Sequence, residues 1–271
     1  DQTREVKASY PVPEGDDTAQ KTYLSMNIVV GSALDQKRIM ALKLLTHVLL
    51  DGNNAPLRLA LLRAGIGSDV SGSLNGSQLQ PVFSVEVSGS DPDKEDQFVK
   101  VLYRTLQDLS RNGIPRRLLE AELNSEEFKM READFNIYPK GLIYGLNVME
   151  TWLYGGDPTT CLRFTDCLDF LRSAIDKGYY EQLIESVLLD NTHKCLVTLT
   201  PEPGKEARDA EQFAQAMAEK GFLVTASVAT GYGREVLPQG ENLTVLTGRL
   251  DEEAMEGLLE KEGFCQVVDA T

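Results

Sequence analysis

The sequence predicts an α+β fold in which helices cover an antiparallel sheet, followed by a small α/β tail. Alternation of polar Ser84, Glu86 and Ser88 with apolar neighbours predicts a strand with one buried face. Apolar residues at helical spacing over 98–109 predict a helix that buries a single stripe. The order of elements is the third observation, because strands, a helix pair, strands and then several helices describe a layered fold.

The N-terminal third supplies most of the predicted sheet. Asp35 is placed to cap a helix that carries Ile39, Leu42, Leu45 and Val48 on one face. A short helix begins at Pro56 and stops at Gly65. Asn75-Gly76 is a hairpin signal between two of the predicted strands. The predicted strands of this part span residues 4–10, 22–31, 66–74 and 80–88.

The stretch from Asn112 to Pro158 predicts two packed helices. Asn112-Gly113 closes the preceding helix, and Pro115 suits the start of the next. The residue before Pro139 avoids the α region, so the chain breaks there. The second helix is apolar through Leu142, Leu146, Met149 and Trp152. Further helices are predicted at 168–175 and 179–189, and a strand at 194–200.

The same stretch carries a family resemblance. EFKMRE at 127–132, YPKGL at 138–142 and WLYGGDP at 152–158 resemble the non-catalytic second domain of presequence proteases, which are zinc metallopeptidases of the pitrilysin/insulinase class. NAPLRLALLRAGIGSD at 54–69, FSVEVSGSDPDK at 83–94 and CLVTLTPEPG at 195–204 agree with it. The resemblance covers residues 1–204. It implies a half-domain with helices packed on an antiparallel sheet, which encloses peptide substrate beside a separate zinc-bearing domain.

The tail from residue 205 resembles a different family. FLVTASVATGYGREVLP, VLTGRLDEEAMEGLL and the final VVDAT are similar to the nucleotide-binding half of precorrin-6A reductases over residues 209–271. Alternating helix and strand predict an incomplete, Rossmann-like α/β segment. The family's first phosphate loop is missing, and the chain stops at Thr271, where the family would continue. We expect a junction near Gly204–Asp209; natural fusion, engineered fusion and gene-assembly error all remain open.

The tail resemblance implies a weak cofactor site. A loop after a strand can present amides and hydroxyls to a dinucleotide phosphate, and Arg249 would accept the extra phosphate of NADP. We expect the incomplete segment to bind NADPH poorly or not at all. The implied cofactor-binding residues are Ser227, Thr230, Gly231, Tyr232, Gly233 and Arg249.

No catalytic or metal site is predicted. A pitrilysin-type enzyme needs His-x-x-Glu-His, and the only two histidines, His47 and His193, do not form that pattern. His47 is expected to be a packed, hydrogen-bonded residue on a mainly apolar helix, and His193 to lie in a loop. Several acids could be read as a carboxylate cluster, but a solvated helix face is the expectation. These acids are Glu120, Glu122, Glu126, Glu127 and Glu132.

The composition limits the classes of partner that the chain can bind. A formal charge of −15 argues against nucleic-acid binding. It would suit basic peptides, although solubility alone explains it. No apolar run is long enough to span a membrane, and the N-terminus lacks the apolar core of a signal peptide. The sequence also lacks an initiator methionine, so we expect an internal piece or a processed product. The four cysteines lack Cys-x-x-Cys spacing, so we expect neither a zinc site nor a disulfide framework. This cysteine usage predicts a cytoplasmic setting.

These observations favour a catalytically inactive domain of an insulinase-family peptidase, which is not active alone. Its expected partners are the catalytic domain of the same family and unstructured peptides, without nucleic acid or membrane. No cofactor is expected in this chain, because zinc would be bound elsewhere in the intact peptidase. The alternatives are an NADPH-dependent precorrin-6A reductase fragment and a structural scaffold for a separate catalytic half.

Overall fold

A computed structural model describes residues 3–133, 137–228, 242–247 and 255–258 of the chain. It divides into two compact units. Unit 1 comprises Asp1–Ala8 and Ala19–Thr200, and unit 2 comprises Ser9–Thr18 and Pro201–Thr271. Each unit is described by itself.

The larger sheet has five strands in the order β1-β5-β2-β4-β3. The central strand β2 pairs antiparallel with both β4 and β5, and β3 pairs antiparallel with β4. The predicted antiparallel sheet is therefore confirmed. Its strands are β1 (Arg4–Val12), β2 (Thr22–Val29), β3 (Asp69–Asn75), β4 (Val82–Ser90) and β5 (Lys194–Pro203).

The helices begin and end close to the positions that local signals predict. The Asp35 carboxylate accepts from the Arg38 amide and caps α1. Gly113 takes a φ of 88° at the end of α3, a left-handed value that glycine adopts without strain. The helices of unit 1 are α1 (Gln36–Leu50), α2 (Pro56–Arg63), α3 (Glu95–Asn112), α4 (Arg116–Glu132), α5 (Lys140–Trp152), α6 (Thr165–Ile175) and α7 (Tyr179–Leu183). Short helical turns are η1 (Pro92–Lys94), η2 (Thr160–Leu162) and the π-helical η3 (Ile184–Leu189).

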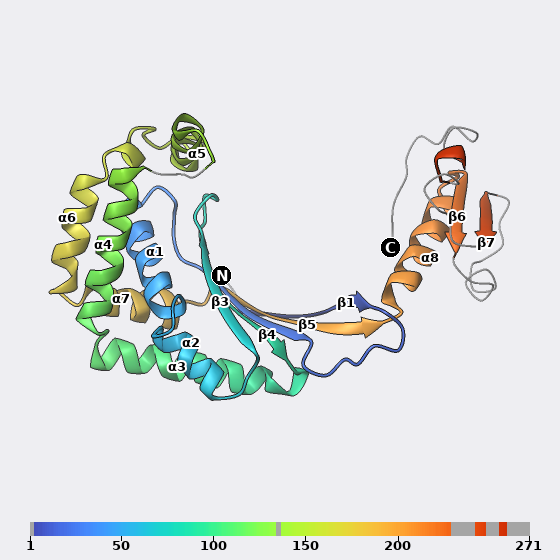
Figure 1. The fold of residues 1–271 in the computed structure, drawn as a ribbon, viewed down its shortest axis with the longest axis horizontal. Helices are drawn as coiled ribbons and strands as arrows, with labels where there is room; N and C mark the ends of the chain where they lie inside the picture. The colour runs from blue at the N-terminus through green and yellow to red at the C-terminus, as the bar shows by residue number, and fades with distance from the viewer. Residues whose placement is uncertain (1–2, 134–136, 229–241, 248–254, 259–271) are drawn as a thin grey trace. The chain divides into compact units, whose positions relative to one another are not determined.

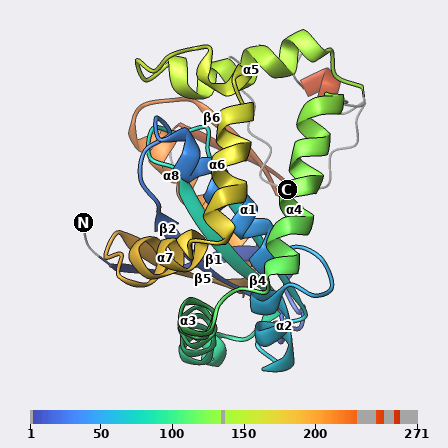
Figure 2. The ribbon, with the colours of Figure 1, turned by 90° about the vertical axis from the view of Figure 1, so that its left-hand side faces the viewer.

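The core lies between one face of the sheet and the helices. Alternate residues of β2 and β4, such as Leu24, Ile28 and Phe83, are fully buried. Helix α1 packs against β3, and α4 and α6 pack against α1 and against each other. Figures 1 and 2 show these helices gathered on one side of the sheet. This arrangement confirms the α+β class of unit 1.

Helix α5 departs from the expectation of two packed helices. The apolar stripe that should have been a packing face is exposed, with Leu142, Leu146, Met149 and Trp152 each between 37% and 58% accessible. The helix itself is where the sequence places it. The prediction that its stripe is packed is wrong, because no described part of the chain covers that face.

Unit 2 contains a small α/β element. Helix α8 (Lys205–Glu219) is followed by β6 (Val224–Val228) and β7 (Leu243–Thr247), which pair in parallel. This confirms the α/β character of the tail over the described residues. None of the helices in the described part of the chain has the length and apolar character that crossing a bilayer requires.

Candidate functional site

Helix α1 carries His47, one of the two histidines of the sequence, and His47 is not part of a His-x-x-Glu-His motif. Lys43 and Thr46 precede His47 on the same helix by four positions and one position. The buried Thr46 hydroxyl donates to the Leu42 carbonyl at 2.7 Å, so it is occupied within the helix.

The side chains around this position are paired with one another. Lys43 Nζ lies 2.7 Å from Glu126 Oε1 on α4, and His47 Nδ1 lies 2.8 Å from Glu122 Oε1. Burial acts to raise the pKa of Glu126, but the charge and hydrogen bond of Lys43, helped by Lys129 and His47, hold that pKa below its usual value. Glu126 is only 9% exposed, so the expectation of a solvated acidic face is wrong for this residue.

These residues do not fit a catalytic zinc ion. Within the described ranges, no group of three or more His, Cys, Asp or Glu side chains could hold a metal. His193 lies in the loop before β5, as predicted, where its amide donates to Asn191 Oδ1 at 2.7 Å. Cys161, Cys167 and Cys195 are free thiols, and Cys265 lies outside the described residues. The α1–α4 cluster is therefore an ion-paired packing contact.

The second candidate is the sheet face that points away from the helices. In β2, the residues between the buried ones are Tyr23, Ser25 and Asn27, and they are partly or fully exposed. They line a shallow depression of about 400 Å³ that crosses three neighbouring strands. The depression is lined by Tyr23, Ser25, Asn27, Glu86, Val197 and Leu199. We call this set the open sheet face.

Strand register places these side chains in rows. Ser25 lies opposite Glu86 on β4 and opposite Val197 on β5. In the next row, the Ser84 hydroxyl donates to Asn27 Oδ1 at 2.7 Å, and Asn27 Nδ2 donates to Ser25 Oγ at 3.0 Å. The face thus offers hydroxyls, an amide and one exposed carboxylate beside apolar side chains. That mixture suits non-covalent contact with a peptide, and these rows contain no pairing of a nucleophile with a base.

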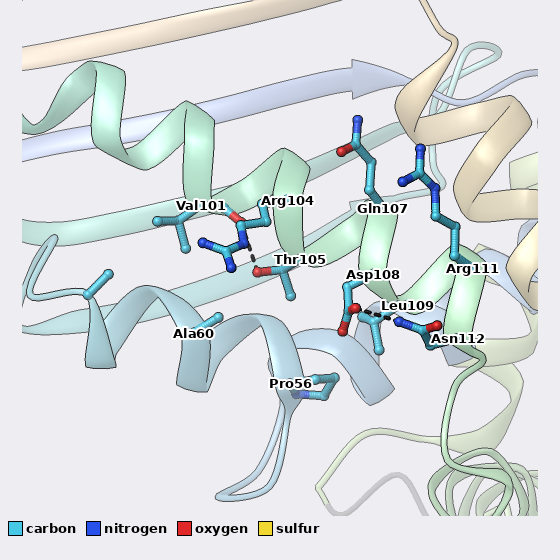
Figure 3. A pocket seen from close by; sticks show the side chains of 11 residues that line it. Pro56, Ala60, Val101, Arg104, Thr105, Gln107, Asp108, Leu109, Arg111 and Asn112 are labelled. Carbon is cyan, nitrogen blue, oxygen red and sulfur yellow. Dashed lines mark hydrogen bonds between the residues drawn. The ribbon is translucent and has the colours of Figure 1, made fainter.

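A third concavity lies between α2 and α3 (Figure 3). This groove of about 670 Å³ is bordered by Pro56 and Ala60 on α2 and by polar residues of α3. Two of those polar residues bond within α3, where Thr105 Oγ1 donates to the Val101 carbonyl at 2.8 Å and Asn112 Nδ2 donates to Asp108 Oδ1 at 2.6 Å. The groove has no converging set of polar groups, and we assign it no chemistry.

The cofactor residues predicted for the tail are mostly beyond the described structure. Ser227 lies in β6, where its backbone is paired in register with Leu246 of β7. The other five, Thr230, Gly231, Tyr232, Gly233 and Arg249, lie outside the described residues. The NADPH site stays a prediction.

Comparison with known proteins matches two different families to two parts of the chain. Residues 1–126 match the model of the peptidase M16 inactive domain, and residues 207–271 match that of precorrin-6x reductase CbiJ/CobK. The chain is 43% identical over 209 residues to Protein HypA of Clostridium perfringens, covering 77% of this chain and 22% of that protein. It is 30% identical over 206 residues to presequence protease 1 of Arabidopsis thaliana, covering 74% and 19% of the two chains. The chain therefore spans about a fifth of the length of these relatives.

A solved structure supports the fold. The inactive peptidase domain of a protein assigned as a zinc protease from Bordetella parapertussis superposes with a TM-score of 0.53 at 15% identity. The match covers 70% of this chain and 95% of that one, so nearly the whole of that domain corresponds to the larger part of this chain. The match of residues 1–126 to the peptidase M16 inactive domain and the likeness to presequence protease 1 confirm the resemblance to the non-catalytic domain of presequence proteases. The N-terminal part of this chain is an inactive domain of the M16 family of zinc peptidases, followed by a segment similar to precorrin-6x reductase.

Proposed function

We propose that unit 1 is a peptide-enclosing domain without catalytic activity of its own. Its open sheet face would form one wall of a peptide chamber, and a separate zinc-bearing domain of the same family would form the other. The substrates would be unstructured peptides, which the zinc-bearing domain cleaves. In this role the domain holds an extended chain and contributes no proton transfer or metal ligand.

The observation that carries the proposal is the open sheet face itself. The helices of unit 1 bury the other face, while the exposed Glu86 can make charge contacts. Ser25 and Asn27 keep hydrogen-bonding capacity beyond the bonds that join them to each other and to Ser84. In the described residues, β3 pairs with β4 alone, so it offers an edge to which an extended peptide can add. The −15 charge favours peptides that carry lysine and arginine.

The relatives support a division of labour between domains. The proteins named presequence proteases are about five times longer than the matched region, which leaves ample length for a zinc-bearing domain. The absence of His-x-x-Glu-His from the sequence supports a domain that binds without cutting.

Peptide binding tests the proposal directly. A fluorescently labelled, unstructured basic peptide is titrated with the whole chain and followed by anisotropy. We expect saturable binding that Glu86→Lys weakens at least about fivefold, because an attraction becomes a repulsion (about 1 kcal/mol for that ratio). The matched control is Glu132→Lys, an equal charge change on exposed α4, which should leave affinity within about twofold. Equal weakening by both variants, or no binding, would refute the open sheet face as the peptide site.

A second candidate concerns the tail. The match of residues 207–271 to precorrin-6x reductase and the parallel β6–β7 pair favour a dinucleotide-binding origin for this segment. Titration with NADPH, followed by the fluorescence of NADPH itself, distinguishes two hypotheses. A functional reductase segment should bind NADPH, whereas the incomplete segment that we expect should not. Co-purification of the chain with a His-x-x-Glu-His protein would instead favour a scaffold for a separate catalytic half.

A further inference from the structure

Helix α5 presents a bare apolar face. Leu142, Leu146, Met149 and Leu153 recur at intervals of four, three and four residues, which places them on one side of a helix. Their side chains are 51%, 56%, 37% and 63% exposed, and Trp152, the only tryptophan of the chain, is 58% exposed beside them. Scattered exposed apolar residues need no explanation, but a continuous stripe does.

Two glycines lie on the same face. At 100° per residue, Gly141, Gly145 and the five large residues fall within an arc of roughly 140°. A Cβ added at Gly141 or Gly145 would meet nothing within 4 Å. A glycine inside a helix costs about 1 kcal/mol relative to alanine, and no described neighbour makes use of the space these two leave. They leave part of the helix surface without side chains, next to the bulky part of the face, and we call this part the hollow.

The opposite side of α5 is mixed, because it carries Lys140, Asn147 and Glu150 as well as apolar residues. Ile143 and Val148 are half-buried and Thr151 is buried, and the main described neighbour of the helix is η2. The apolar face of a surface helix normally packs against another element. One side of α5 is therefore packed within unit 1, while the other is suited to a partner.

We propose that this face binds a second copy of the chain, with the two α5 helices antiparallel about a twofold axis. The hollow of Gly141 and Gly145 is in the N-terminal half of α5, and Trp152 and Leu153 are at its C-terminal end. Antiparallel pairing therefore brings the large residues of each helix over the glycines of the other. The face is complementary to itself, as a twofold interface must be.

Charge and area agree with a second copy as the occupant. The arc contains no charged residue, although the whole chain carries −15, so two copies can meet there without bringing like charges together. The exposed fractions of the five large side chains amount to roughly 500–600 Å² for side chains of this size. Two such faces bury roughly 1,000–1,200 Å² in total, which is at the small end of specific interfaces. The dimer is therefore reversible.

The mass of the whole chain in solution tests the pairing. Light scattering after gel filtration, over loading concentrations around 10 μM, should show the mass rising from 29.9 kDa toward twice that value. Gly145→Leu fills the hollow and should hold the chain at the monomer mass. It also raises helix propensity in open space, so misfolding is not expected of it. Leu146→Asp should act the same way.

A matched control and a second signal complete the test. Leu79→Asp introduces the same charge at a residue that is 44% exposed outside α5, and it should leave the dimer intact. Trp152 fluorescence should shift to the blue and resist acrylamide quenching as concentration rises, in wild type but not in Gly145→Leu. A constant monomer mass, or a dimer that persists in Gly145→Leu with an unprotected Trp152, overturns the proposal.

Discussion

The ion pair between Lys43 and Glu126 joins α1 to α4 and contributes to the stability of their packing. The buried carboxylate depends on the lysine, so Lys43→Met leaves a charge without its main partner. We expect a loss of about 1–3 kcal/mol of unfolding free energy, at the low end of buried-pair deletions because Lys43 is half exposed. Urea denaturation at neutral pH measures it. The double variant Lys43→Met/Glu126→Leu should recover most of the loss, and equal losses in both variants would contradict an electrostatic cause.

The same pair gives the chain a pH dependence of known sign. The pKa of Glu126 is lowered in the folded state, so its stabilisation is complete above the unfolded value near 4.3 and is lost as pH falls below it. We expect the urea midpoint of wild type to fall between pH 6 and roughly pH 3.5 by more than that of Lys43→Met/Glu126→Leu. Parallel profiles for the two proteins would show that Glu126 does not contribute.

Single residues were the hardest to predict from sequence. An acid on a helix with basic neighbours indicates a solvated face, and this holds for Glu132 but not for Glu126. The burial of Glu126 depends on Lys43, which lies 83 positions away in the chain. Alternation in β4 identified the side of Glu86, while its cross-strand neighbours, Ser25 on β2 and Ser71 on β3, required the sheet order.

At the scale of elements, close approach of the chain to β4 depends on Gly67. A Cβ at this position would lie 2.5 Å from the Ser88 carbonyl oxygen and 2.4 Å from a Val87 methyl group. We expect Gly67→Ala to cost about 1–3 kcal/mol, because the backbone must shift to admit the methyl group. Gly76→Ala is the control, since its Cβ would have only Ile39 Cγ2, at 3.9 Å, within reach. Thermal melts measure the melting midpoints of both variants. Equal midpoints would show that β4 can shift to admit the methyl group without a loss of stability.

Element boundaries followed from the sequence because their signals are local. Asp35, Pro56 and Asn112-Gly113 act within a turn of the helix ends that they mark. Packing partners are not local. The stripe of α5 shows that the helix requires a covering surface, and it does not say whether the same chain supplies one. The expectation that α5 buries its stripe against a neighbouring helix was wrong for this reason.

At the scale of the molecule, the main core belongs to one part of the chain. Its buried residues run from Leu24 to Leu196, before the junction predicted near Gly204. We expect the free energy of unfolding of a chain ending at Gly204 to lie within about 1 kcal/mol of that of the main transition of the whole chain. Denaturation followed by circular dichroism checks this. A truncated chain that fails to fold would contradict independent folding of the peptidase part.

The central claim is that the M16 part binds peptide without cleaving it. Native mass spectrometry of the whole chain, mixed with zinc and an unstructured basic peptide, tests this in one experiment. We expect a complex of the 29.9 kDa chain with uncut peptide and no retained zinc ion. A shortened peptide whose formation a chelator prevents, or no complex at any peptide concentration tested, would contradict it.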